Sequence, residues 1–222
     1  MIGDMDRRSL LTGVVATGAL GALPSRLLGQ APNEAGGLSL TAPATPFTIS
    51  DQHRRVLAVA REQLERTRAQ VWRGDVVGVI DFALPSSLPR FHFANLEAGT
   101  VRSFLVAHGR GSDPEHDGFL KTFSNQPNSF ATSRGAYITY EWYKGKYGTS
   151  IRLNGIDADN SNVLNRAIVL HPAWYANEDM LAKWGKLGRS DGCFAMGETD
   201  FNEALWHLSG GRLIFADKLG LG

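Results

Sequence analysis

The chain has 222 residues, 43% of them hydrophobic and 20% charged, so it has the length and composition of a globular protein with one sizeable domain. Its formal net charge is +1, and the basic and acidic residues outside the first 31 positions balance at 20 each. Nucleic-acid binding needs a clustered positive excess, so this balance excludes nucleic acid as the main partner.

Residues 1–31 are predicted to be a signal peptide. Arg7 and Arg8 precede an apolar stretch, residues 10–23, which is short for a membrane span and contains three glycines. This order is typical of a twin-arginine signal, with a Sec signal or an uncleaved anchor as alternatives. We therefore expect export to the periplasm or cell envelope, without stable membrane insertion after cleavage. Residues 32–50, rich in proline and small residues, are expected to form a flexible linker.

A helix is predicted from Ser50 or Asp51 to about Trp72, within an N-terminal helical segment at 51–75. Leu57, Leu64 and Val71 recur on one stripe of this helix. We expect that stripe to pack on the sheet that follows, as part of the core.

Residues 76–222 are predicted to form the main domain, and the mature chain is expected to be mostly β with two peripheral helices. A buried strand at 76–84 and strands at 90–97 and 100–107 predict an antiparallel meander, followed by a long polar loop at 108–135. Later strands are predicted at 137–143, 149–153, 167–170 and 212–217, with a helix from Thr199 to Leu208.

Cys193 is the only cysteine in the chain. An exported protein with one cysteine carries a free thiol in an oxidising compartment, where the thiol is exposed to damage unless it is buried or used. A nucleophilic thiol needs a base, because a thiol of ordinary pKa is mostly protonated at neutral pH. The alternative is a buried cysteine that acts only as a small apolar residue.

His171 is the best candidate for that base, because it ends a predicted buried strand and so has a rigid support. Ser190 is expected to orient the thiol or the imidazole through its hydroxyl. Gly192 lets the backbone approach a substrate closely, so its N–H and that of Cys193 are candidate oxyanion donors. His108, at the start of the long loop, is a candidate substrate contact. The order of histidine before cysteine differs from the papain-like pattern.

At these residues the chain resembles the murein L,D-transpeptidase catalytic domain family (YkuD-like). The family signature is a histidine followed, after a spacer, by Ser/Thr-His-Gly-Cys, and His171, Ser190, Gly192 and Cys193 stand at matching positions. The resemblance extends over residues 79–217 and includes the segments 79–87, 106–112, 123–125, 145–148, 152–155 and 188–190.

The chain departs from the family pattern in four ways, one of which is a spacer slightly longer than in central members. Asp191 replaces the second histidine, Pro172 replaces a glycine, and Phe194-Ala195-Met196 lacks the arginine that often follows the cysteine. His171 is therefore the only histidine within the motif. We expect Arg189 and Asp191 to contact substrate beside it.

The resemblance implies an L,D-transpeptidase-like β-sandwich at 76–222 that transfers acyl groups on peptidoglycan. Cys193 would attack the amide before the terminal D-alanine of a tetrapeptide stem and pass the acyl group to a neighbouring stem, giving a 3→3 cross-link. Alternatives are an L,D-carboxypeptidase or thiol amidase that passes the group to water, and a non-catalytic wall-binding relative. Peptidoglycan stem peptides are the expected partners of a monomer that needs no cofactor and no metal.

Overall fold

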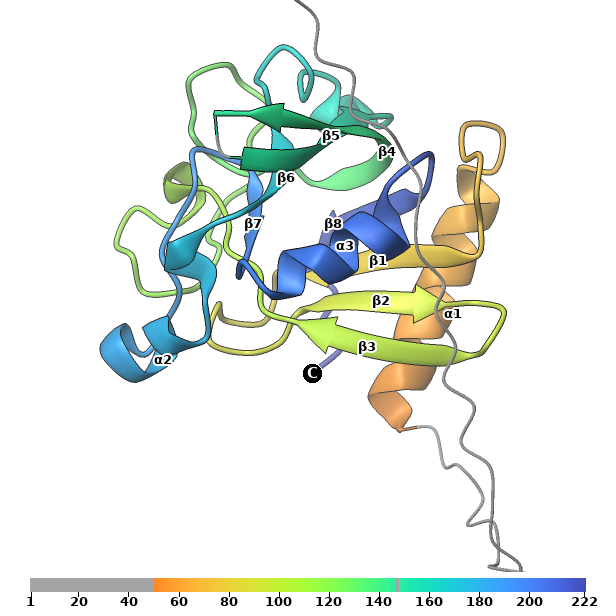
Figure 1. Ribbon diagram of the computed structural model, residues 1–222, viewed down its shortest axis with the longest axis horizontal. Coiled ribbons are helices and arrows are strands. Elements are labelled where there is room, and N and C mark those ends of the chain that lie inside the picture. Colours follow the sequence, from red (N-terminus) through yellow and green to blue (C-terminus); the bar gives the residue numbers. More distant parts are fainter. Residues whose placement is uncertain (1–49, 147) are drawn as a thin grey trace, which may run out of the picture. The chain divides into compact units, whose positions relative to one another are not determined.

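The computed structural model describes residues 50–146 and 148–222. The predicted signal peptide and all of the predicted linker except Ser50 lie outside the described residues. One curled sheet of eight strands, in the order β3-β2-β1-β8-β4-β5-β6-β7, organises the described part (Figure 1). The strands are β1 (Val76–Asp81), β2 (Phe91–Asn95), β3 (Thr100–Phe104), β4 (Gly135–Gly145), β5 (Gly148–Gly155), β6 (Val169–Pro172), β7 (Phe194–Met196) and β8 (Leu213–Asp217).

Helix α1 (Asp51–Arg66) covers one face of this sheet. The Ser50 hydroxyl accepts a hydrogen bond from the His53 amide at 3.2 Å and caps the helix, as the sequence predicts. Val56, Leu57 and Ala60 are buried against β1, β2, β3 and β8. Fully burying a valine or leucine side chain contributes about 1.5–3 kcal/mol, so this stripe is core.

The helix ends at Arg66, and the predicted end near Trp72 was wrong. Thr67 donates hydrogen bonds to the Gln63 carbonyl from both its amide, at 3.1 Å, and its hydroxyl, at 2.7 Å. The chain then turns, and the Trp72 amide bonds to the carbonyl of Gly211 instead of to helix backbone. Val71 is still buried, so the apolar stripe continues beyond the helix.

The meander predicted for the first three strands is confirmed: β1 pairs with β2, and β2 with β3, both antiparallel. All six residues of β1 are buried because both faces are covered. Val77 and Val79 pack with α1, while Val76 and Ile80 face the larger hydrophobic cluster. A strand near the middle of a sheet with two covered faces needs this continuous apolar sequence.

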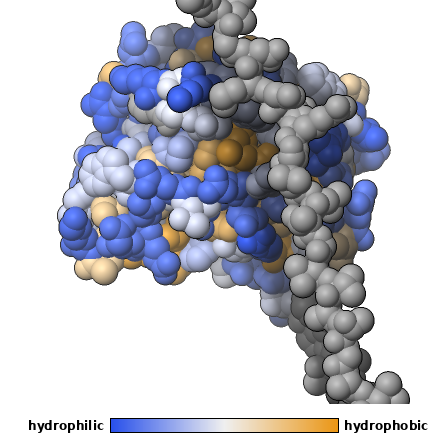
Figure 2. All heavy atoms as spheres, viewed as in Figure 1, coloured by the Kyte–Doolittle hydropathy of each residue, from blue (hydrophilic) through white to orange (hydrophobic). Residues whose placement is uncertain are grey.

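The larger hydrophobic cluster lies inside the curl of the sheet and receives side chains from all eight strands. Helix α3 (Asp200–Leu208) fills the remaining space with Phe201, Ala204 and Leu208. In Figure 1, α3 lies between β1–β3 on one side and β4–β6 on the other. Figure 2 shows mostly hydrophilic residues on this face of the molecule, with hydrophobic ones gathered near its centre. The predicted mostly β fold is thus confirmed.

The last strand, β8, occupies the middle of the sheet. It pairs parallel with β1 and antiparallel with β4. The buried carboxylate of Asp81, at the end of β1, accepts hydrogen bonds from the amides of Leu219, Gly220 and Leu221 at 2.6–3.2 Å. The segment after β8 is therefore fastened to the end of β1.

Two elements near the site were not predicted. Helix α2 (Asp179–Trp184) lies within the spacer between His171 and Ser190, and β7 follows Cys193 directly. The predicted strand at 167–170 is shifted, because Ala167 has φ +52° and belongs to a turn, while β6 begins at Val169. Among the described residues, no helix is long and apolar enough to cross a membrane.

Candidate active site

His171 lies in β6, and Cys193 is the residue directly before β7, the strand beside it. Strand β6 pairs with β7 in parallel, with Leu170 opposite Phe194 and His171 opposite Ala195. Side chains alternate along a strand, and paired residues share a face, so His171 and Cys193 lie on the same face, one diagonal step apart. Diagonal neighbours are about 7–8 Å apart between backbones, within reach of longer side chains.

Both side chains line one hollow of about 150 Å³. Its other walls are Tyr175, Arg189, Ser190 and Asp191. Cys193 is only 6% exposed and His171 only 2%, so the thiol and the imidazole meet solvent only where they border this hollow. Five of the predicted site residues therefore surround one small opening.

Burial is the main influence on the thiol. It raises the pKa of Cys193 to about 11, because a thiolate loses solvation there, and the carboxylate of Asp191 acts in the same direction. A backbone hydrogen bond from Val169 and the charge of Arg166 oppose this rise in pKa. The thiol Sγ lies 3.8 Å from the carbonyl oxygen of Ala167, to which it donates. The structure thus holds a protonated thiol in need of a base.

The imidazole of His171 is set up in one tautomer. Its Nδ1 lies 2.9 Å from the Pro172 carbonyl oxygen, which can only accept, so Nδ1 carries the proton. In the neutral ring this leaves Nε2 with a lone pair for accepting a proton. Burial lowers the pKa of His171, and the bond to Pro172 offsets this only in part. Pro172, one of the departures from the family pattern, thereby fixes the ring through its carbonyl.

Ser190 acts on the turn before the thiol. Its hydroxyl donates to the Cys193 carbonyl at 2.6 Å and accepts from the Gly192 amide at 3.1 Å. The serine therefore orients the thiol through the backbone of the turn. The Gly192 N–H is already engaged by this serine, so it would have to leave the bond before serving as an oxyanion donor. Gly192 has φ +117°, a conformation that favours glycine.

The start of the long loop lies against this turn. The amide of Arg110 donates to the Ser190 carbonyl, and the amide of Ser190 donates to the His108 carbonyl, at 2.8 and 2.9 Å. A Cβ on Gly109 would lie only 2.4 Å from the Phe130 carbonyl oxygen and 2.8 Å from the Gly192 nitrogen. The loop predicted to be functional is therefore packed backbone to backbone against the turn that carries Cys193.

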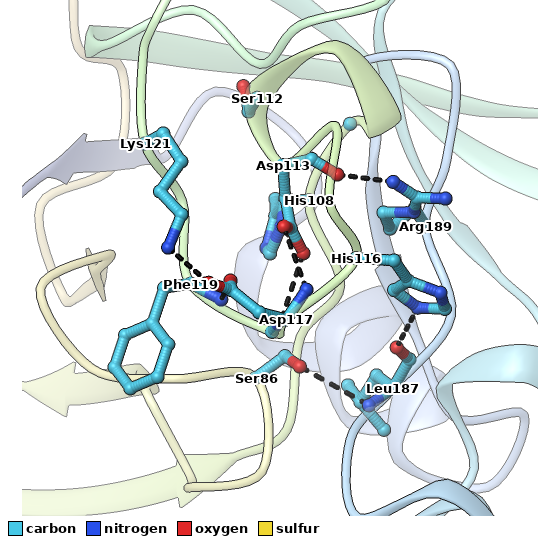
Figure 3. A network of polar contacts seen from close by, with 12 residues as sticks. Ser86, His108, Ser112, Asp113, His116, Asp117, Phe119, Lys121, Leu187 and Arg189 are labelled. Carbon is cyan, nitrogen blue, oxygen red and sulfur yellow. Dashed lines mark hydrogen bonds and ion pairs between the residues drawn. The ribbon is translucent and has the colours of Figure 1, made fainter.

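The structure buries the side chain of His108, expected to contact substrate, away from the hollow. It is 1% exposed, and its Nδ1 lies 2.7 Å from the Arg90 guanidinium. Its Nε2 lies 3.4 Å from Asp113, which is drawn beside it in Figure 3. Burial, and then the charge of Arg90, lower the pKa of His108 to about 2, so the ring is neutral. Only the backbone of His108 supports the site, as an acceptor for Ser190.

Arg189 and Asp191 both border the hollow, but each is held by the long loop. Arg189 Nη1 donates to the carbonyls of Asp113 and Pro114, and Figure 3 shows it reaching toward Asp113. Asp191 accepts from Arg110 Nε at 2.7 Å in an exposed ion pair. The loop therefore sets the position of the charged side chains at the opening.

Arg166 and Tyr175 are two residues near the thiol that sequence reasoning missed. Tyr175 lines the hollow with His171, and Arg166 lines a neighbouring hollow of about 220 Å³ that shares Asp191 with the first. Tyr175 stands within the spacer before the cysteine, where an aromatic residue close to the histidine is a usable signal. Arg166 had no such signal, because only the pairing of β6 with β7 brings its segment beside Cys193.

No metal centre accompanies the site within residues 50–146 and 148–222, where no three His, Cys, Asp or Glu side chains are placed to hold an ion. The chemistry available to the described residues is that of a thiol, an imidazole and backbone amides. These are the groups that nucleophilic attack on an acyl group requires: a nucleophile, a base and hydrogen-bond donors.

Comparison with solved structures gives several L,D-transpeptidases. An L,D-transpeptidase from Mycobacterium smegmatis has 15% identity, covers 64% of this chain and 58% of its own, and has a TM-score of 0.41. L,D-transpeptidase 3 from Mycobacterium tuberculosis has 14% identity, with 64% and 61% covered and a TM-score of 0.42. The chain thus spans less than two thirds of these relatives' lengths. No curated protein sequence matches the chain.

The family model for the L,D-transpeptidase catalytic domain matches residues 49–216. The match includes α1, every strand except the last residue of β8, and the whole motif from His171 to Cys193. It begins before the first residue predicted for the main domain, so the family unit includes the N-terminal helix. The chain belongs to the L,D-transpeptidase catalytic domain family.

Proposed function

We propose that this protein is a cysteine L,D-transpeptidase that acts on the tetrapeptide stems of peptidoglycan. The observation that carries the proposal is that His171, in β6, and Cys193, directly before the paired strand β7, border one hollow within a chain of this family. The export predicted from residues 1–31 agrees with a substrate outside the cytoplasm. We expect the protein to act there as a monomer.

The first half-reaction makes a thioester. His171 Nε2 takes the proton of the Cys193 thiol as Sγ attacks the carbonyl carbon between meso-diaminopimelate and the terminal D-alanine. The C–N bond then breaks, and D-alanine leaves as an amine that takes the proton back from His171. The bond from Nδ1 to the Pro172 carbonyl keeps the neutral ring in the tautomer in which Nε2 is the basic nitrogen.

The second half-reaction regenerates the thiol. An amine of a neighbouring stem attacks the thioester carbonyl, gives its proton to His171, and forms the amide of a 3→3 cross-link. The Cys193 thiolate leaves and is protonated by His171. In both halves the developing oxyanion needs an amide donor, and the Cys193 N–H is the candidate that does not require Gly192 to leave Ser190.

Muropeptide analysis tests this function. Cells or sacculi treated with the wild-type protein should yield 3→3 dimers and tripeptides with release of D-alanine, while Cys193→Ala should yield neither, because the nucleophile is gone. Trp206→Ala, at an 81% exposed surface position, is the matched control and should behave like the wild type. Identical profiles from the wild type and Cys193→Ala would refute the proposal. Tripeptides without dimers would indicate transfer to water.

One observation favours a second candidate, a wall-binding protein without catalysis. The thiol is 6% exposed, and burial raises its pKa to about 11, which disfavours the nucleophilic form. Intact-mass spectrometry after incubation with a carbapenem separates the two functions. A stoichiometric adduct on Cys193 supports catalysis, whereas binding to sacculi without any adduct supports the second candidate.

A further inference from the structure

Arg166 is a half-buried cation whose guanidinium donates four hydrogen bonds. Nη1 donates to the Ser124 carbonyl and to the Ser133 hydroxyl, both at 2.7 Å. Nη2 donates to the Ser129 hydroxyl at 3.1 Å and to the Ala131 carbonyl at 2.5 Å. All four terminal N–H groups of the guanidinium thus donate hydrogen bonds to one segment of the long loop, residues 124–133.

The same guanidinium lies beside the turn that carries the thiol. A Cβ on Gly192 would be 3.3 Å from Nη2 of Arg166. The residue after Arg166 is Ala167, whose carbonyl lies 3.8 Å from Cys193 Sγ. Ala167 has φ +52°, an uncommon conformation for alanine, and the local chain holds it there. The guanidinium of Arg166 therefore lies beside the turn that carries the thiol, and the next residue in the chain contacts the thiol directly.

Several other charges surround the thiol, and each is held in its own way. Asp191 opposes a thiolate by its negative charge, but Arg110 pairs with it in an exposed ion pair. Arg189 borders the hollow with its guanidinium bonded to loop carbonyls. His171 gains a positive charge only by taking the thiol's own proton. Arg166, like Arg189, is a permanent cation bonded to neutral acceptors, but Arg166 is the arginine that lies beside Gly192 and whose charge acts on the Cys193 thiol.

The buried thiol needs such a cation. Burial penalises both members of a thiolate–imidazolium pair, since it raises the pKa of Cys193 and lowers that of His171. A guanidinium keeps its charge throughout the working pH range and cannot give a proton back to the thiolate. Because Arg166 is already fixed, its charge acts on the thiolate without reorganisation.

We propose that Arg166 is the cation that stabilises the thiolate of Cys193 while it fixes the loop at 124–133 against the turn. It acts without touching the reacting bond, so it is a positioning residue. The step it favours is transfer of the Sγ proton to His171 Nε2, in which the S–H bond breaks and the electron pair stays on sulfur. This role rests on the proposed function only for the identity of the nucleophile.

The chain's single cysteine allows a direct test, because the mass gained with iodoacetamide in excess of that gained by Cys193→Ala reports on Cys193. The full-length wild type, Arg166→Gln and Arg166→Lys are compared from pH 7 to 11. Removing the charge in Arg166→Gln should raise the apparent pKa of the thiol by about one unit, which slows alkylation about tenfold below that pKa. Arg166→Lys retains a charge and should keep most of the wild-type profile.

Arg102→Gln is the matched control, since Arg102 is an exposed arginine paired with Glu203 on α3. It should leave the profile unchanged. A folded Arg166→Gln protein with alkylation rates within twofold of the wild type would overturn the proposal.

If Arg166→Gln does not fold, the alkylation profile of Arg166→Lys tests the proposal instead. Lysine keeps the charge but cannot make the four hydrogen bonds. An alkylation profile like that of the wild type would therefore show that the charge stabilises the thiolate. A rise of a full unit in the apparent thiol pKa would show that only loop packing matters, and would overturn the proposal. Alkylation needs no peptidoglycan, so this result is independent of the muropeptide experiment.

Discussion

The half of the sheet under α1 and the end that carries the thiol are held together by different forces. Strands β1, β2, β3 and β8 are joined by long registers and covered by apolar side chains from α1 and α3. At the other end, β6 and β7 have four and three residues, and the long loop is held by hydrogen bonds to the turn directly before β7. Apolar packing tolerates small changes in shape, whereas a hydrogen-bonded turn depends on exact backbone placement. The comparison therefore predicts that stability and reactivity respond to changes in different halves.

The largest effect is expected from Gly109→Ala, at the contact between the loop and the thiol turn. The new Cβ would collide with the backbone of Phe130 and Gly192 and displace the turn, so D-alanine release should fall at least about 100-fold. Gly74→Ala is the matched control, because its Cβ meets only the flexible end of Leu64 at 3.0 Å. Retention of activity within threefold in Gly109→Ala would show that the turn is not held by this contact.

Ile80→Ala tests the other half. Ile80 is fully buried in β1, so the truncation should lower the free energy of unfolding in urea by about 2–5 kcal/mol. At a temperature where the protein stays folded, the alkylation profile of Cys193 should match the wild type. Trp206→Ala, on the exposed side of α3, should change stability by less than about 0.5 kcal/mol. A changed thiol profile in Ile80→Ala would mean that the two halves are coupled.

A third, smaller effect concerns alkaline pH. The thiol pKa is about 11 in the folded protein and about 9 in the unfolded chain, so folding favours the protonated form. This contribution is complete below pH 9 and is lost as the pH rises toward 11, because the unfolded chain loses its proton first. The wild type should therefore lose up to about 2–3 kcal/mol of unfolding free energy relative to Cys193→Ala across this range. If the free energy of unfolding changed with pH in the same way in both proteins, the thiol would ionise as easily in the folded protein as in the unfolded chain.

The apolar half could be predicted from the sequence because local pattern and tertiary environment agree there. The continuous run in β1, the alternation in β2 and the stripe on α1 each follow from the face that they bury. The end of α1 was missed because Thr67 closes the helix through a side-chain bond that propensity does not encode.

The site was predictable in its motif and less so in its surroundings. His171, Ser190 and Cys193 follow from residue type and order, whereas α2 and β7 are too short to give a periodic signal. His108 was expected to contact substrate, but its side chain instead lies against Arg90, which directly precedes β2. The sequence does not reveal a contact between residues so far apart along the chain. Arg166 escaped notice for the same reason: its neighbours come from segments far along the chain.

The position of β8 also determines when this protein can fold. The strand that completes the middle of the sheet is among the last residues of the chain, and neither β1 nor β4 has its full set of partners without it. During synthesis the earlier strands would therefore stay open-edged until β8 has left the ribosome. Contacts between such distant segments also make folding slow. The thiol turn, 20 residues before β8 along the chain, therefore leaves the ribosome before the strand that completes the sheet.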